Sequence, residues 1–171
     1  MHCEHGCRIC GGGGIRRITV RNLEEKDAQI SYKWRNDKEV FKYTGNIYSN
    51  YISYETELGW IKRVIKNTNE YRCAIEVDGM YVGNIYLTDI IDGESAEYHI
   101  FIGEKDYWGM GIAEEASRQI LKYGFDARKL KYVYLHVRED NERAVRLYEK
   151  LGFFPAEKED FWIKMIKRHH L

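Results

Sequence analysis

Residues that cross-link or interrupt a chain are scarce in this sequence. Its 171 residues include one proline and four cysteines, against fourteen tyrosines. So little proline favours strands and long helices over a loop-rich scaffold. Three of the cysteines fall within the first ten residues, whereas the disulfide framework of a small secreted domain spreads its cysteines through the fold. We therefore expect a globular protein of the reducing cytoplasm.

An excess of charge of either sign is also missing. The 27 Lys and Arg residues balance the 27 Asp and Glu residues, so the formal net charge is zero. Broad binding of polyanions needs a positive surface, so we expect neither nucleic acid nor an anionic membrane as a partner. No run in the sequence approaches the roughly 20 apolar residues of a membrane-spanning helix. A local site for a small anionic ligand stays open.

Length and composition predict one folded domain after a short extension. A chain of 171 residues with 44% hydrophobic residues is long enough for one core. Four glycines at positions 11–14 separate the extension, residues 1–14, from the expected domain, residues 15–171. The glycine run is typical of a linker.

The extension holds three candidate metal ligands, Cys3, Cys7 and Cys10, with two histidines nearby. Cysteines at such a spacing can bind zinc or an iron–sulfur cluster. Their spacing resembles the cluster motif of radical SAM enzymes, but the strand–helix repeats of those enzymes do not follow. We favour a flexible appended segment, with a metal-dependent recruitment module as the alternative, and the chemistry predicted below needs no metal.

Hydrophobic periodicity predicts an α/β fold with a mixed, mostly antiparallel central sheet flanked by helices. Asp-Gly at 78–79 and at 92–93 indicates tight turns between three consecutive strands. The expected strands are residues 15–20, 71–77, 81–90, 95–102, 132–137 and 161–166. The expected helices are residues 24–34, a helix capped by Ser53 that runs to about 66, a helix from the glycine turn at 109–111 to about 128, and residues 140–151.

The segment 97–116, EYHIFIGEKDYWGMGIAEEA, joins a strand to a helix through two glycines. Gly109 and Gly111 allow the backbone to approach a ligand closely, and the following helix start offers unpaired N–H groups and the positive end of the helix dipole. This combination suits a phosphate or pyrophosphate. Neither the Walker loop nor the G-x-G-x-x-G dinucleotide fingerprint is present.

A second segment, DNERAVRLYEKLGF at 140–153, predicts a helix that begins at an Asp or Asn cap and ends at Gly152. Asn141 and Tyr148 are seven residues apart and so lie on one helical face, two turns from each other. Together, the two segments resemble the acetyl-CoA-binding core of the GNAT N-acetyltransferase superfamily, in its RimJ/RimL-like branch. The sequence WRND at 34–37 also resembles that branch, and the likeness covers about residues 15–167.

The resemblance implies acetyl-CoA as the cosubstrate. It implies that the loop with Trp108 and Gly109 presents backbone N–H groups of Met110, Gly111, Ile112 and Ala113 to the CoA pyrophosphate. Phe101 and Ile102 match a strand that pairs with the pantetheine arm, and Asn141 matches a family asparagine. Asp106 stands where the family often has Arg or Gln, which puts one side-chain contact in question but leaves the backbone contacts in place.

Acetyl transfer to an amine needs an acid and a base. An alkylammonium ion, with a pKa near 10.4, cannot attack a thioester until it loses a proton. The resemblance assigns Tyr148 as the acid that protonates the departing thiolate. For the base we favour Glu97, which shares a strand face with His99 and Phe101. His99, directly or through water, is the alternative.

The resemblance places the acceptor between the loop that joins the first two helices and the final hairpin. The expected contacts are Trp34, Tyr43, Tyr48, Tyr51 and Glu55, with Glu57 as a further cation partner, because aromatic rings and carboxylates suit an ammonium ion. The hairpin between Phe153 and Phe161 looks shorter than in the spermidine and ribosomal-protein members of the branch.

We therefore expect a small-molecule primary amine, such as an amino-sugar or a polyamine, and a monomer or homodimer. A protein N-terminal (ribosomal-protein-like) acetyltransferase and a non-catalytic acyl-CoA-binding regulatory module are the alternatives.

Overall fold

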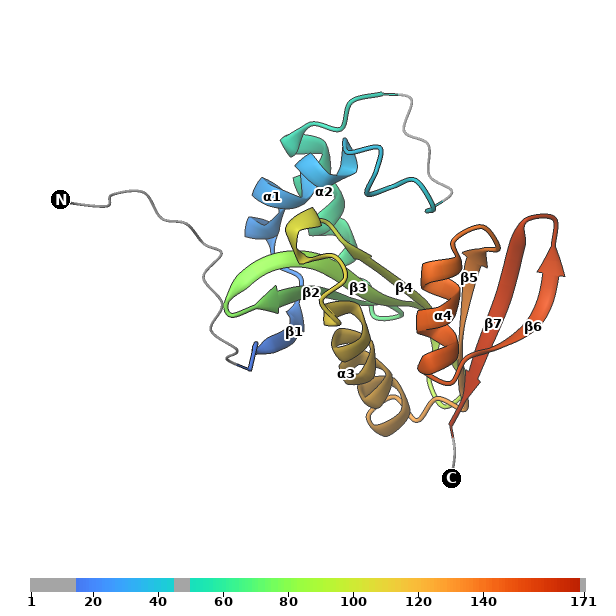
Figure 1. Cartoon of the computed structure of the whole chain (residues 1–171). Coiled ribbons are helices and arrows are strands. Elements are labelled where there is room, and N and C mark those ends of the chain that lie inside the picture. The colour runs from blue at the N-terminus through green and yellow to red at the C-terminus, as the bar shows by residue number, and fades with distance from the viewer. Residues whose placement is uncertain (1–14, 45–49, 170–171) are drawn as a thin grey trace.

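Seven strands and four helices make up the fold in a computed structural model that describes residues 15–44 and 50–169 (Figure 1). In chain order the elements are β1 (Ile18–Asn22), the short 3-10 helix η1 (Glu25–Asp27), α1 (Ala28–Arg35), α2 (Tyr54–Val64), β2 (Tyr71–Val77), β3 (Met80–Ile91), β4 (Ser95–Ile102), η2 (Lys105–Tyr107), α3 (Ile112–Asp126), β5 (Tyr132–Arg138), α4 (Glu142–Lys150), β6 (Phe154–Glu159) and β7 (Trp162–Arg168).

The strands form one sheet in the order β1-β2-β3-β4-β5-β7-β6. Every neighbouring pair is antiparallel except β4 and β5, which are parallel. Helices α1 and α2 lie on one face of the sheet, and α3 and α4 lie on the other (Figure 1). This arrangement confirms the predicted α/β fold with a mixed, mostly antiparallel sheet.

The three central strands form as the turn residues predict. Asp78 and Gly79 have φ angles of 50° and 82°, as a two-residue hairpin turn requires. Strand alternation then sends neighbouring side chains to opposite faces. Cys73 and Ile75 pack into the core under α3 and α4, whereas Ala74 packs under α1 and α2.

Strands β4 and β5 stay together for only a short stretch. They pair at Ser95–Tyr132, Ala96–Val133 and Glu97–Tyr134, and at no later residue of either described strand. Beyond Glu97, β4 continues against β3 while β5 continues against β7. The sheet is therefore open between β4 and β5 on the side where α3 and α4 begin, and this opening is the feature that positions the site.

Two local predictions differ from the structure. The helix expected at 24–34 is divided into η1 and α1, because Asp27 side-chain oxygens bond the Glu24 N–H and the Arg21 guanidinium at the start of the segment. Strand β6 was not predicted as a separate strand. It is exposed along its whole length and contains Pro155, so it lacks the alternating apolar pattern that marks a half-buried strand.

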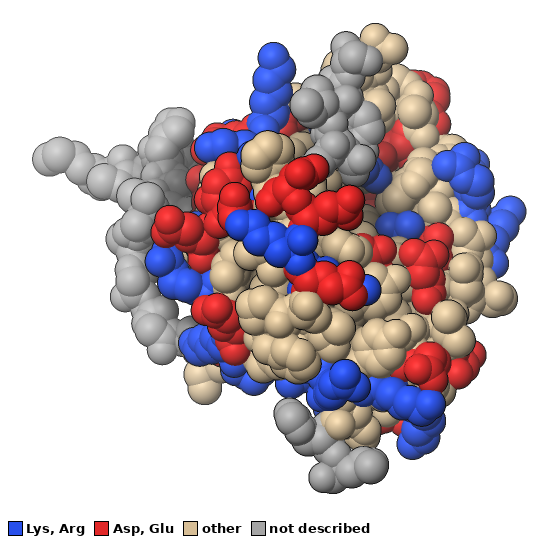
Figure 2. Space-filling view, turned by 90° about the vertical axis from the view of Figure 1, so that its right-hand side faces the viewer, with Lys and Arg blue, Asp and Glu red and all other residues tan. Residues whose placement is uncertain are grey.

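The expected extension falls on residues 1–14, which lie outside the described residues. Across the part of the chain that the structure covers, no helix is long and apolar enough to cross a membrane. Within the same residues, no three His, Cys, Asp or Glu side chains are grouped so that they could hold a metal ion. On the face drawn in Figure 2, basic and acidic side chains are interspersed and form no continuous basic surface.

Candidate active site

The glycine turn before α3 forms a backbone cradle, defined here as residues 108–113. Gly109 and Gly111 both have φ angles of 76°, a conformation that side chains with a Cβ rarely adopt. Gly111 is the N-cap of α3, so the first N–H groups of the helix lack partners within it. The Trp108 indole N–H donates to the Ile102 carbonyl over 2.8 Å, which ties the cradle to the end of β4.

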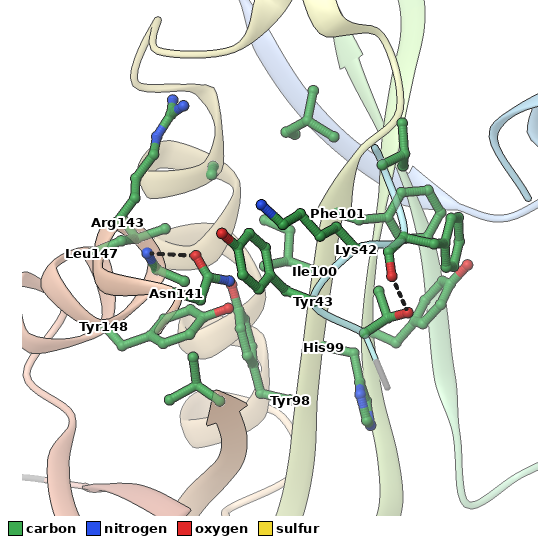
Figure 3. Close-up of a pocket in the computed structure, with 18 of the residues that line it drawn as sticks. Lys42, Tyr43, Tyr98, His99, Ile100, Phe101, Asn141, Arg143, Leu147 and Tyr148 are labelled. Atoms are coloured by element: carbon green, nitrogen blue, oxygen red, sulfur yellow. Dashed lines mark hydrogen bonds between the residues drawn. The ribbon is translucent and has the colours of Figure 1, made fainter. Parts of the chain in front are cut away.

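A cavity of about 960 Å³ runs along this cradle. It is lined by Phe101 and Ile102 of β4, by all six cradle residues, and by Asn141 and Tyr148 from the α4 region. Figure 3 shows Phe101 on one side of the cavity and Asn141 and Tyr148 on the other. All the residues that the sequence assigns to acetyl-CoA therefore border one cavity. An ideal Cβ placed on Gly111 meets nothing within 4 Å, so the turn is glycine because of its backbone angle and faces open space.

Arg143, in the first turn of α4, also lines the cavity and was missed by the sequence analysis. A Cβ placed on Gly109 would lie 3.5 Å from Arg143 Nη2, so the guanidinium lies against the cradle. No ion pair of Arg143 is present in the described part of the chain. A cation beside free N–H groups suits a phosphate, the chemistry that the glycine turn predicts.

Tyr148 lies on α4 between the cradle and β4. Its ring makes edge contacts with Tyr98 and Phe153, at centroid distances of 5.8 and 6.0 Å. Burial raises the pKa of the Tyr148 hydroxyl above its usual value of 10, so the hydroxyl keeps its proton at neutral pH. Tyr98 differs, because its hydroxyl lies 2.6 Å from the Ser117 hydroxyl and is therefore already occupied.

Asn141 has a structural role as well as a place in the cavity. It is the N-cap of α4, and its Oδ1 accepts the Ala144 N–H over 3.4 Å (Figure 3). The cap fixes where α4 begins, and Tyr148 follows two turns later on the same face. Asn141 thus positions the helix that carries Tyr148.

On the other face of the sheet, Glu97 lies at the point where β4 and β5 separate. Its Oε1 is 2.7 Å from His136 Nδ1, and its Oε2 is 3.6 Å from His99 Nε2. Contacts with His99 and His136 lower the pKa of Glu97 from 4.5 to about 2, so its carboxylate is ionised at neutral pH. His136, from β5, was not among the predicted residues.

These three side chains lie where two cavities meet. His99 and His136 line both the large cavity and a smaller one of about 420 Å³, while Glu97 lines the smaller one. Thr44 and Trp162 also border both. Tyr148 and the histidines therefore approach one opening in the sheet from its two faces.

The predicted acceptor residues are only partly brought together. Tyr43 lines the large cavity (Figure 3). Trp34 is buried beneath Gly103, and its indole N–H donates to Glu104 over 2.9 Å. Tyr51 and Glu55 are exposed and lie outside the cavity lining defined by the described residues, and Tyr48 falls outside the described residues.

Glu57, predicted as a cation partner, is buried and engaged within the protein. It accepts the Ser31 hydroxyl over 2.7 Å and the Arg35 guanidinium over 3.1 Å. Arg35 and Arg72 in turn lie over the Trp60 ring, 4.4 and 5.2 Å from its centroid. Arg35, Trp60 and Arg72 also line the large cavity.

The fold, the cradle and the opening between β4 and β5 define an acetyltransferase of the GNAT type. Residues 17–154 match the family described as the acetyltransferase (GNAT) domain, and the chain belongs to that family. The predicted superfamily is thereby confirmed.

Individual relatives of this chain have named activities. Spermidine N(1)-acetyltransferase of Escherichia coli is 30% identical over 137 residues, which cover 80% of this chain and 72% of that protein. Acetyltransferase PseH of Campylobacter jejuni is 25% identical over 157 residues, covering 90% and 96% of the two chains. The relatives thus include spermidine and PseH acetyltransferases. They support membership of the GNAT family but do not specifically support the predicted RimJ/RimL-like branch.

Solved structures of acetyltransferases superpose on this fold. Spermidine N-acetyltransferase of Vibrio cholerae, in complex with CoA and spermine, superposes with a TM-score of 0.80 at 26% identity and covers 88% of this chain and 95% of that one. PseH of Campylobacter jejuni, in complex with acetyl coenzyme A, has a TM-score of 0.71 at 19% identity and covers 90% and 100%, a likeness of fold.

Proposed function

We propose that this protein transfers the acetyl group of acetyl-CoA to the primary amine of a small molecule. One observation carries the proposal. The opening between β4 and β5 joins a cavity lined by the phosphate-type cradle and Tyr148 on one face to Glu97, His99 and His136 on the other. A thioester lying in the opening would have an acid on its sulfur side and proton acceptors on its acceptor side.

The cradle side suits the CoA portion. Backbone N–H groups of residues 110–113 and the guanidinium of Arg143 offer donors to the pyrophosphate. The edge of β4 beyond Glu97, facing β5, has no strand partner within the described sheet, so its backbone groups are free to pair with the pantetheine arm. A freed β4 N–H in the same stretch can also stabilise the oxyanion of a tetrahedral intermediate.

Tyr148 is proposed as the acid. Its hydroxyl keeps its proton because burial raises its pKa. No hydrogen bond to this hydroxyl occurs within the described ranges, so the group is available to a ligand in the cavity. Transfer of this proton to the departing thiolate is worth roughly 10²–10⁴ in rate.

Glu97 and His99 are proposed on the base side, where they face the acceptor region together. The ionised Glu97 attracts an ammonium ion and orders water beside it. The polarity of this region, with Tyr43 and Lys42 on the wall, suits a small polar amine. Spermidine, the amine named for one of the relatives, and amino-sugars, the class expected from the sequence, are the acceptors to try first.

The WRND sequence at 34–37 supports placement in the RimJ/RimL-like branch. We place the enzyme in the cytoplasm, where acetyl-CoA is made and used. We propose a monomer or a homodimer, although one solved spermidine acetyltransferase of Vibrio cholerae is dodecameric, and sizing of the purified protein decides between these states.

The test is release of thiol from acetyl-CoA across a panel of polyamines, amino-sugars, other small amines and N-terminal peptides. We expect turnover with at least one small amine and a rise in melting temperature with acetyl-CoA. Turnover with peptides alone would favour the protein N-terminal acetyltransferase. A thermal shift without turnover on any acceptor would favour the non-catalytic binding module.

A further inference from the structure

Beyond Glu97 a histidine follows on each of the diverging strands. Glu97 and Tyr134 are the last pair between β4 and β5. Two residues later, on the same face of each strand, come His99 and His136. Glu97 thus lies at the vertex of the opening with one histidine on each arm, and both imidazoles are nearly half exposed to the cavities.

The two histidines are held in different ways. His136 Nδ1 lies 2.7 Å from Glu97 Oε1, and an ionised carboxylate can only accept, so Nδ1 carries the hydrogen and Nε2 carries the lone pair. His99 Nε2 instead lies 3.0 Å from the Thr88 hydroxyl, which can donate or accept and so does not fix the tautomer. Nε2 of His136 has no partner among the residues that the structure describes.

Glu97 itself is poorly suited to take a proton at neutral pH. One carboxylate oxygen accepts the His136 Nδ1–H and the other lies 3.6 Å from His99 Nε2, and the proximity of both imidazoles lowers the pKa of Glu97 to about 2. An anion held in this state orients the neighbouring imidazole and stabilises the imidazolium that forms when the ring takes a proton. The carboxylate therefore orients the imidazole and stabilises its charge, and the imidazole takes the proton.

We propose that His136 is the catalytic base of the acetyl transfer and that Glu97 is its positioning residue. This assignment rests on the proposed function, and it moves the role of base from Glu97 or His99 to a residue that the sequence did not single out. Nε2 of His136 takes one proton from the acceptor ammonium. The freed lone pair forms the N–C bond to the thioester carbonyl carbon, and the carbonyl electron pair moves to oxygen.

The carbonyl re-forms as the C–S bond breaks, and the departing sulfur takes a proton from Tyr148. The nitrogen loses its second proton as the amide forms, and this proton returns through the cavity to the Tyr148 oxygen, which gave its own proton to the sulfur. The imidazolium of His136 then returns its proton to water through the open cavity.

Besides Glu97, charged groups near His136 come from β7, from the end of β6 and from the turn between these strands. Lys164 is its register partner on β7, while Glu159 at the end of β6 and Asp160 in the turn after it line the same small cavity. Tyr134 makes an edge contact with the imidazole at 5.9 Å, and Lys164 Nζ lies 5.3 Å from the Tyr134 ring centroid. Variants at Lys164 would alter the field at His136 but not the tautomer that Glu97 fixes.

The test is the pH profile of kcat/KM with the best acceptor from the panel. We expect the activity of the wild-type protein to fall on the acid side as the base is protonated. His136→Gln should lower kcat/KM by roughly 10²–10⁴ and remove this acid limb. His169→Gln is the matched control, because His169 stacks on Phe125 at 5.0 Å outside both cavities, and it should keep the wild-type profile.

A second acceptor gives a readout that a purely structural role would not move. An O-alkyl hydroxylamine analogue of the best acceptor is far less basic than an alkylamine, so it is neutral at pH 7 and needs no base for its first proton, and the loss in His136→Gln should shrink with it. Glu97→Gln should lower kcat more than it raises KM, and Glu97→Asp should recover part of the loss. Calorimetric binding of acetyl-CoA, unchanged in every variant, shows that each has folded.

Three results would overturn the assignment: an acid limb retained in His136→Gln, an equal loss with both acceptors, or a limb that disappears in His99→Gln alone. If the wild-type protein acetylates no amine, the proposed function fails first, an outcome distinct from all three.

Discussion

Replacing Gly111 by alanine has two effects that can be measured separately, one on the stability of the fold and one on the binding of acetyl-CoA. Gly111 has a φ of 76°, and an added Cβ would meet no atom within 4 Å. The substitution therefore introduces backbone strain without a clash, at a cost of about 1–2 kcal/mol in folding free energy. In a chain of this length, each kcal/mol of lost stability lowers Tm by roughly 2–4 °C.

Gly93 offers a matched control. It has a φ of 73°, an added Cβ would again meet no atom within 4 Å, and it lies in the turn between β3 and β4, outside both cavities. Gly93→Ala should lose the same stability as Gly111→Ala. Only Gly111→Ala should also lose affinity for acetyl-CoA, because its Cβ projects into the space beside the free N–H groups of α3.

The size of the affinity loss follows from the contacts at risk. Weakening one hydrogen bond to a charged phosphate costs about 1.5–3 kcal/mol, a factor of roughly 10–150 in Kd. Chemical denaturation measures the first effect, and calorimetric titration with acetyl-CoA measures the second. Equal affinities in the two variants would refute the placement of the pyrophosphate at this turn.

Three further predictions concern the rest of the site. Tyr148→Phe should lower kcat by roughly 10²–10⁴ and leave the Kd of acetyl-CoA nearly unchanged; steady-state kinetics with the best acceptor checks this, and an unaltered kcat would remove the acid role. Because the pKa of Glu97 is lowered from 4.5 to about 2 in the folded state, its ionised form stabilises the fold above about pH 4.5, and this contribution disappears as the pH falls towards 2. The difference in unfolding free energy between wild type and Glu97→Gln should therefore shrink over that range, and a pH-independent difference in denaturant titrations would contradict the ion contacts. Deleting residues 1–14 should leave kcat/KM unchanged; metal analysis of both forms, together with their activities, decides whether a metal bound at Cys3, Cys7 and Cys10 contributes to turnover.

Local chemistry in the sequence is enough to predict most of the fold. Asp78-Gly79 requires left-handed backbone angles and therefore specifies a hairpin, and Ser53 begins α2 by accepting the Thr56 N–H over 3.1 Å. Each of these residues determines the backbone conformation only within a few residues of its own position. The confirmed strands β2, β3 and β4 and the helix that follows Gly111 are of this kind.

The acceptor side could not be predicted in the same way. His136 and Glu97 are 39 residues apart, and they meet only because β4 and β5 pair in parallel for three residues and then separate. Trp34 shows the converse, since an aromatic residue near a predicted loop was expected at the acceptor and is instead buried against Gly103. Neither the place where two strands diverge nor the packing partner of a tryptophan is a local property of the sequence.

The short pairing of β4 and β5 also bears on how the molecule opens. Within the sheet, β5, β7 and β6 are hydrogen-bonded to the remaining strands only through the three residue pairs at 95–97 and 132–134. A ligand that spans the opening would supply the backbone partners that the protein lacks there. Acetyl-CoA should therefore slow amide hydrogen exchange in β4 and β5 together, because it bridges two strands that the free protein joins by only three residue pairs. The bound cosubstrate would thus take the place of a strand between β4 and β5, and its release would open the sheet there again.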